Sequence, residues 1–217
     1  MQTLILVPTR AEMDLIFGCH EPSCTPWPNV NAALCGFGQL LTGMQTLRLL
    51  IAGDYDQCLL VGHGGCFDPD KVPIGQAVLC RGFHQYGFGF CEDGQIRSYA
   101  QTVVASLIDA DDYQPATLIP QSPTADALQV VDCLSVFSAS GDVQEAAKRH
   151  DWFSMDIEEM EGYAAALACR QMNVPFGAIR GITNQAGDRD HANWRMNEAA
   201  DAIRAALQAL FANVSQA

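Results

Sequence analysis

Residues 158–190 constrain the fold more than any other stretch of the chain. Within it, residues 160–172 repeat apolar or small side chains at helical spacing, which predicts a helix. Asn173 can adopt the left-handed conformation that ends a helix, and Pro175 prevents the helix from continuing. Residues 175–182 are small and apolar apart from one arginine, as expected for a strand buried on both faces of a largely parallel sheet. The stretch therefore predicts a helix followed by a buried strand.

Polar side chains stand where this predicted strand ends and where the helix begins. Thr183 and Asn184 follow the strand, and Glu161 stands at the helix start. The other acids at the helix start are Asp156, Glu158 and Glu159. Ligands of open α/β sheets bind beyond the carboxyl ends of the strands, so Thr183, Asn184 and Glu161 could face one cleft. A second interpretation stays open here: the acids only stabilise the positive end of the helix dipole, and Thr183 and Asn184 only begin a turn.

Strand and helix patterns alternate along the rest of the chain. Strands are predicted at residues 3–7, 58–61, 75–81 and 127–137, and helices from residue 10 and at residues 39–52, 98–108, 142–150 and 193–214. A chain of 217 residues can bury one sizeable core, and nothing in its composition requires a second domain. We therefore predict a single α/β domain over residues 1–217, with a central twisted mixed sheet flanked by helices.

Two further polar features follow predicted strands. Glu12 comes just after the first strand, where an acid can be a helix-front charge or a catalytic group. Gly62, His63, Gly64 and Gly65 follow the strand at residues 58–61 and are predicted to form a turn. Glycines after a strand let a ligand approach the backbone, but a tight turn needs glycine too. His63 could touch a ligand or be an ordinary polar loop residue.

The charge and hydropathy of the chain argue against two kinds of partner. The formal net charge is −13, with only twelve Lys and Arg, which disfavours binding to a nucleic-acid backbone or an anionic membrane surface. The longest apolar runs fall far short of the ~20 residues of a membrane span. The amino terminus lacks the basic lead-in of a secretion signal, so we expect a cytoplasmic protein that does not cross a membrane.

The cysteines and histidines do not predict a disulfide framework or a metal site. Nine cysteines are scattered through predicted core segments without a C-x-x-C pair, which indicates buried free thiols in a reducing compartment. The five histidines show none of the usual ligand spacings for a structural metal. We predict neither a metal nor a cofactor.

Residues 158–184, EEMEGYAAALACRQMNVPFGAIRGITN, resemble the signature of the nucleoside phosphorylase and nucleosidase superfamily. In that signature Glu-Met-Glu-Gly opens a helix, and Val-Pro-Phe leads to a strand that ends Arg-x-Ile-(Ser/Thr)-(Asp/Asn). Within the superfamily, residues 180–194 are most similar to the futalosine hydrolase family, which carries Asn where the methylthioadenosine/S-adenosylhomocysteine nucleosidases carry Asp. The resemblance implies a nucleoside phosphorylase-like fold, a homo-oligomer, and hydrolysis of futalosine to hypoxanthine and dehypoxanthine futalosine, a step of menaquinone biosynthesis.

Three residues are candidates for the sugar side of such a site. Cleavage of a purine N-glycosidic bond builds positive charge on the ribose, so carboxylates are needed near the sugar. Glu161 is the candidate that binds the ribose hydroxyls, with the backbone of Met160 beside it. Glu12 is the candidate general base that deprotonates the attacking water.

Two residues are candidates for contacts with the base, and two more are expected to bind the substrate. Asn184 is expected at the N7 and O6 edge of the purine, where its NH₂ group can donate to two acceptors and so favours hypoxanthine over adenine. Thr183 and Gly64 are expected beside the ligand, and Phe137 is the candidate for packing on the base.

Other functions stay open from the sequence. A purine nucleoside phosphorylase would need an anion site built from Arg and backbone amides. Arg10 is the one basic residue near the end of the first strand, and Glu12 beside it would repel phosphate, which favours water as the nucleophile. The remaining alternatives are an adenosine-type nucleosidase and a non-catalytic nucleoside-binding protein.

Overall fold

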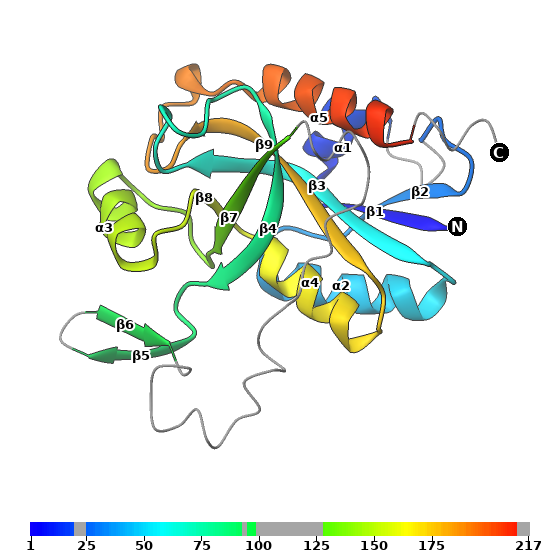
Figure 1. The fold of residues 1–217 in the computed structure, drawn as a ribbon, viewed down its shortest axis with the longest axis horizontal. Coiled ribbons are helices and arrows are strands. Elements are labelled where there is room, and N and C mark those ends of the chain that lie inside the picture. The colour runs from blue at the N-terminus through cyan, green and yellow to red at the C-terminus, as the bar shows by residue number, and fades with distance from the viewer. Residues whose placement is uncertain (20–24, 93–94, 99–127, 212–217) are drawn as a thin grey trace.

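A seven-stranded mixed sheet forms the centre of the molecule (Figure 1). The computed structural model of the chain describes residues 1–19, 25–92, 95–98 and 128–211. The strands, in the order β2-β1-β3-β8-β7-β4-β9, are β2 (Val30–Leu34), β1 (Thr3–Val7), β3 (Gln57–Cys66), β8 (Ile157–Glu159), β7 (Gln129–Ser135), β4 (Ala77–Gln85) and β9 (Phe176–Gln185). Because β9 also pairs with β3, the last five of these strands close into a ring.

The three strands that carry the predicted site are parallel to one another. β1 pairs with β3, and β3 pairs with β9, so their carboxyl ends lie at one edge of the sheet. A separate antiparallel hairpin of β5 (Gly89–Glu92) and β6 (Gln95–Ser98) stands away from this sheet (Figure 1). The predicted α/β fold with a mixed central sheet is confirmed.

Helices cover both faces of the sheet. The helices α1 (Arg10–Phe17) and α5 (Met196–Phe211) lie on one face, and α2 (Gln39–Ala52) and α4 (Gly162–Gln171) lie on the other (Figure 1). Side chains of β1 alternate between the two layers: Leu4 and Leu6 belong to the core on the α2 and α4 side, and Ile5 and Val7 to the core on the α1 and α5 side. Burial on both faces explains why this strand is a continuous apolar run. A further helix, α3 (Val143–Phe153), follows β7.

The helix boundaries agree with the sequence signals for most of the chain. α2 has the predicted bounds, and Asn173 has the predicted left-handed backbone, with φ of 54°. The predicted helix at residues 193–214 appears as α5, and its last residues lie outside the described part of the chain. The predicted helix at residues 98–108 also lies outside that part, except for Ser98, which ends β6.

Two local predictions were wrong. Gly62, His63, Gly64 and Gly65 form no turn but continue β3 to Cys66, because each of them pairs with β9 across a register shift between Gly64 and Gly65. Thr183 and Asn184 likewise lie inside β9, which ends one residue later.

The acids before α4 also differ from the prediction. Glu158 and Glu159 do not belong to the helix start but form β8 with Ile157, which pairs with both β3 and β7. Glu161 stands at the N-cap position of α4, and its side chain makes no capping hydrogen bond. The helix itself begins at Gly162.

Five cysteines of the predicted core are buried free thiols, as expected: Cys35, Cys58, Cys80, Cys133 and Cys169. The expectation was wrong for Cys19, which is disulfide-bonded, and for Cys91, which is exposed. Burial raises the pKa of the Cys35 thiol to about 12. Within the described part of the chain, no helix combines the length and the apolar composition of a membrane span.

Candidate active site

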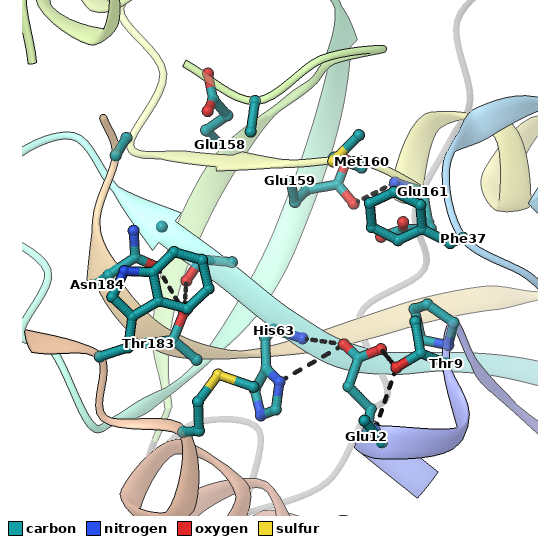
Figure 2. A pocket seen from close by; sticks show the side chains of 18 of the residues that line it. Thr9, Glu12, Phe37, His63, Glu158, Glu159, Met160, Glu161, Thr183 and Asn184 are labelled. Carbon is teal, nitrogen blue, oxygen red and sulfur yellow. Dashed lines mark hydrogen bonds and ion pairs between the residues drawn. The ribbon is translucent and has the colours of Figure 1, made fainter. Parts of the chain in front are cut away.

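A cavity of about 480 Å³ opens where β1, β3, β8 and β9 end (Figure 2). Of the predicted site residues, Glu12, Gly64, Met160, Glu161, Thr183 and Asn184 line it. The structure therefore brings together side chains that are up to 172 positions apart in the sequence, since both Glu12 and Asn184 line this cavity.

Glu12 is fixed at the start of α1 by the residue that caps this helix. Thr9 accepts a hydrogen bond from the backbone N–H of Glu12, and the Thr9 hydroxyl donates to Oε2 of Glu12 at 2.6 Å. The other carboxylate oxygen, Oε1, accepts from the backbone N–H of His63 at 2.9 Å. Both oxygens are thus oriented, and each keeps a lone pair for a ligand.

Glu161 lies across the cavity and is held by two donors. Its Oε1 accepts from the backbone N–H of Gly38 at 2.9 Å, and its Oε2 lies 3.1 Å from Nη2 of Arg180. Burial raises the pKa of Glu161 to about 7, and the nearby carboxylate of Glu159 adds to this shift, whereas Arg180 opposes it. The carboxyl group is therefore partly protonated at neutral pH.

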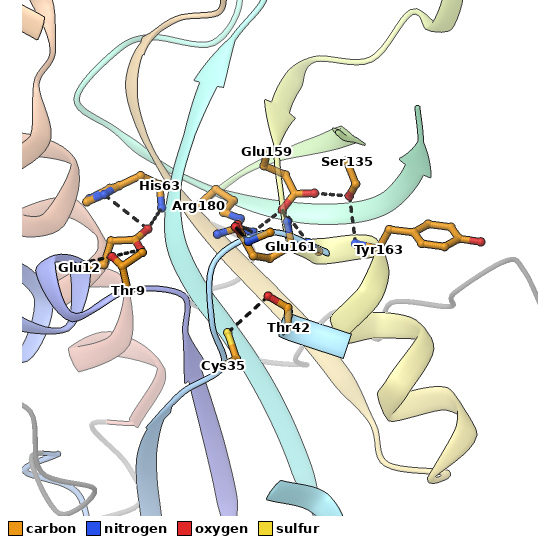
Figure 3. Close-up of polar contacts among 12 residues, drawn as sticks. Thr9, Glu12, Cys35, Thr42, His63, Ser135, Glu159, Glu161, Tyr163 and Arg180 are labelled. Atoms are coloured by element: carbon orange, nitrogen blue, oxygen red, sulfur yellow. Dashed lines mark hydrogen bonds and ion pairs between the residues drawn. The ribbon is translucent and has the colours of Figure 1, made fainter. Parts of the chain in front are cut away.

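Glu159 contacts both the backbone of Glu161 and the side chain of Arg180 (Figure 3). Its Oε2 accepts from the backbone N–H groups of Glu161 and Gly162 at 2.9 and 2.7 Å, which caps the first turn of α4. The same oxygen pairs with Arg180, and the other oxygen accepts from the hydroxyl of Ser135. The sequence analysis considered that all the acids before α4 stabilise the positive end of the helix dipole. In the structure, the Glu159 side chain makes this interaction.

Arg180 is the central residue that the sequence prediction missed. Its side chain is fully buried and contacts the carboxylates of both Glu159 and Glu161. A Cβ atom at Gly62 would lie 2.6 Å from Nη1 of Arg180 and 2.8 Å from Oε1 of Glu12, so any larger residue there would displace these two side chains. A lone arginine in an apolar strand was the available signal, because a buried charge has to be paired.

Thr183 and Asn184 form the opposite wall (Figure 2). The Thr183 hydroxyl donates to Oδ1 of Asn184 at 2.7 Å. The Asn184 NH₂ group donates to the carbonyl oxygen of Gln185 at 2.7 Å and more weakly to that of Asp188 at 3.4 Å. These contacts fix the orientation of the amide, and a ligand acceptor can replace Asp188 as the partner of the weakly bonded N–H.

Phe137 is the one predicted site residue that the structure does not bring to the cavity. Its side chain is 62% exposed, and the neighbouring wall is formed by Ala139. A packing role of Phe137 on the base remains an untested prediction. Among the residues that the structure describes, no cluster of three or more His, Cys, Asp or Glu side chains is placed to hold a metal ion.

The fold and the site define a class of α/β protein with a cavity at the carboxyl ends of its strands, with carboxylates on one wall and an amide on the other. The chain belongs to the phosphorylase superfamily, whose family model matches residues 28–217. This membership confirms the resemblance carried by residues 158–184.

Individual relatives cover nearly the whole chain. It is similar to the futalosine hydrolase of Thermus thermophilus, with 27% identity over 219 residues that cover 96% of this chain and 95% of that protein. Its fold is similar to that of the native futalosine hydrolase of Helicobacter pylori, with a TM-score of 0.70, 16% identity and 98% of each chain covered. A Colwellia psychrerythraea 5′-methylthioadenosine/S-adenosylhomocysteine nucleosidase in complex with adenine gives a TM-score of 0.72 at 17% identity, covering 99% of this chain and 96% of that one.

Proposed function

We propose that the protein hydrolyses the N-glycosidic bond of a purine nucleoside, and that this nucleoside is futalosine. The observation that carries the proposal is the meeting of Glu12, Glu161 and Asn184 around one cavity. Glycosidic cleavage needs negative charge near the sugar and hydrogen-bond donors near the leaving base, and these walls supply both.

On the sugar side, the two acids take different roles because their surroundings differ. Glu161, held by Gly38 and Arg180, accepts hydrogen bonds from the ribose hydroxyls, with the backbone of Met160 beside it. Glu12, oriented by Thr9 and the backbone of His63, takes the proton of the attacking water. General-base catalysis of this kind contributes roughly 10²- to 10⁴-fold.

On the base side, Asn184 selects the purine. An amide N–H can donate to the O6 or N7 acceptor of hypoxanthine, whereas a 6-amino group presents a second donor to it. Thr183 holds the amide in this orientation. The futalosine hydrolase relative from Thermus thermophilus, which is covered over 95% of its length, supports the same substrate and hence a step of menaquinone biosynthesis.

The runner-up function, a phosphorylase, finds less support in the charges around the cavity. Glu12, Glu158, Glu159 and Glu161 line it, and Arg189 is the only Arg or Lys among the described lining residues. Such a wall would repel phosphate. Arg180 is fully buried, does not line the cavity and pairs through Nη2 with two carboxylates, and the side chain of Arg10 is exposed.

The proposed reaction is tested by incubating purified protein with futalosine, inosine and methylthioadenosine, with and without phosphate, and measuring the released base. We expect hypoxanthine from futalosine without phosphate. Release that requires phosphate would establish a phosphorylase, preferential release of adenine would establish an adenosine-type nucleosidase, and no release from any nucleoside would leave a binding protein.

The proposal includes a homo-oligomer in the cytoplasm. Exposed apolar side chains follow one another along α2 and the turn before it, at Phe37, Leu40, Leu41, Met44 and Ile51. Phe37 also lines the cavity, so a second copy on this surface would lie beside the site. Buried free thiols suit a reducing compartment. Analytical ultracentrifugation of the protein and of a Met44→Glu variant tests the oligomer, since the variant should dissociate.

A further inference from the structure

His63 has a largely enclosed ring whose two nitrogens are buried and have no hydrogen-bond partner among the described residues. Its side chain is 9% exposed, and both Nδ1 and Nε2 lack a partner among the described residues. Buried polar atoms without partners are rare in folded proteins, and each instance calls for an explanation. The ring lines the cavity and faces the carboxylate of Glu12 (Figure 2).

The distance between the two side chains points to a third molecule between them. Nδ1 of His63 lies 3.7 Å from Oε1 of Glu12, which is too long for a direct hydrogen bond. One water oxygen can lie at hydrogen-bond distance from both atoms. Such a water would donate one proton to the Glu12 carboxylate and the other to Nδ1 of His63, so both acceptors would have a partner. The lone pairs of the water would stay free to attack the sugar.

We propose that His63 is a further catalytic residue, which together with Glu12 holds the water that attacks the sugar. The inference rests on the proposed hydrolysis and adds a residue to it. In the step, the water oxygen bonds to the anomeric carbon, the carbon–nitrogen bond breaks with its electron pair going to the purine, and the water proton passes to Glu12. The His63 ring accepts a hydrogen bond throughout and does not change its protonation state.

The charged groups around the ring suit this role. Two such groups of the described chain act on it, Glu12 from α1 and Arg180 from β9. Burial lowers the pKa of His63, Arg180 adds to this shift, and Glu12 opposes it, so the ring is neutral and able to accept at neutral pH. At low pH a protonated ring would pair with Glu12 directly and remove the acceptor that the water needs.

The test compares His63→Phe and His63→Asn with a control, His84→Asn. His84 is also partly buried with a pKa lowered by burial, but it does not line the cavity. Release of hypoxanthine from futalosine without phosphate is measured across pH 4–9 in the full-length protein, and thermal unfolding reports on folding. A nucleophile misplaced by ~1 Å loses about 10²-fold in rate.

We expect His63→Phe to lower kcat by about 10²-fold at pH 7 with a nearly unchanged KM, and His63→Asn, which keeps an acceptor, to recover part of that loss. In His63→Asn the plot of log kcat/KM against pH should also lose about one unit of slope on its acid side, and His84→Asn should match the wild type.

The inference is overturned if kcat of both His63 variants lies within about threefold of the wild type, or if the acid-side slope is unchanged in His63→Asn. If His63→Phe does not fold, the slope of His63→Asn decides. Failure of the wild type to release base without phosphate would instead overturn the proposed function.

Discussion

Nη2 of Arg180 lies 3.1 Å from Oε2 of Glu161, and the two side chains are 0% and 5% exposed. The same nitrogen also contacts Glu159, so one buried guanidinium serves two buried carboxylates (Figure 3). A single positive charge cannot fully compensate both acids and their desolvation, which is why the pKa of Glu161 rises to about 7. The carboxylate proposed to bind the ribose is thereby placed at the midpoint of its titration at neutral pH.

The raised pKa of Glu161 predicts how nucleoside binding depends on pH. The ionised form accepts hydrogen bonds from ribose hydroxyls better than the protonated form, and it becomes dominant as the pH rises through about 7. Affinity for inosine should therefore rise across this range in wild-type protein and stay flat in Glu161→Gln. Isothermal titration calorimetry at pH 5.5–8.5 measures both. A wild-type affinity that is constant over that range would contradict the role given to Glu161.

The Arg180 pair predicts a large difference in stability between two arginine substitutions. Arg180→Met leaves two buried carboxylates without their cation and should lower the free energy of unfolding by about 3–5 kcal/mol. Arg81→Met is the control, because Arg81 pairs with Asp132 but is 62% exposed, and an exposed, solvent-screened ion pair contributes little to stability. Urea unfolding at pH 7 compares them. Equal midpoints for the two variants would show that Arg180 does not stabilise the fold.

The sequence predicted the helix and strand that carry Glu161 and Asn184, because their signals are local. Apolar periodicity, a left-handed Asn173 and the following Pro175 depend on neighbouring residues alone. The extension of β3 through His63 was not predictable in this way. Glycines favour turns in isolation, and here pairing with β9 overrides that preference.

The missed role of Arg180 has a similar cause. Its partners, Glu159 and Glu161, are 21 and 19 positions away, and the pairing depends on the ring of strands that joins β9 to β3 and β8 to β7. Glu159 resembled a helix-front acid because β8 is only three residues long and exists through its neighbours. The grouping of six predicted site residues around one cavity was predictable, but the ion pairs behind them required the tertiary structure.

The amide of Asn184 predicts a change in base preference when it is replaced by a carboxylate. Asn184→Asp removes the NH₂ donors and places negative charge beside the carbonyl oxygens of Gln185 and Asp188. Loss of one hydrogen bond to the base is worth ~1–2 kcal/mol, so kcat/KM for inosine should fall about 10-fold, and the ratio of inosine to methylthioadenosine cleavage should fall with it. Asn29→Asp is the control, because Asn29 is exposed, does not line the cavity and accepts from Gln2 through an Oδ1 that aspartate keeps. An unchanged ratio of inosine to methylthioadenosine cleavage in Asn184→Asp would show that Asn184 does not select the base.

The geometry around Glu12 predicts that its charge matters for turnover and much less for binding. In Glu12→Gln the amide oxygen can still accept from Thr9 or from the backbone N–H of His63, so the local structure should persist. The amide cannot take a proton from water, and kcat should fall by roughly 10²- to 10⁴-fold while the dissociation constant for inosine stays within a few-fold. Stopped-flow or fixed-time measurement of free base, together with calorimetric binding, separates the two quantities.

Glu198→Gln makes the same chemical change on a side chain that is 61% exposed and should behave as the wild type. Wild-type turnover in Glu12→Gln would remove the general base from the mechanism, and equal losses of turnover and affinity would assign Glu12 to substrate binding instead.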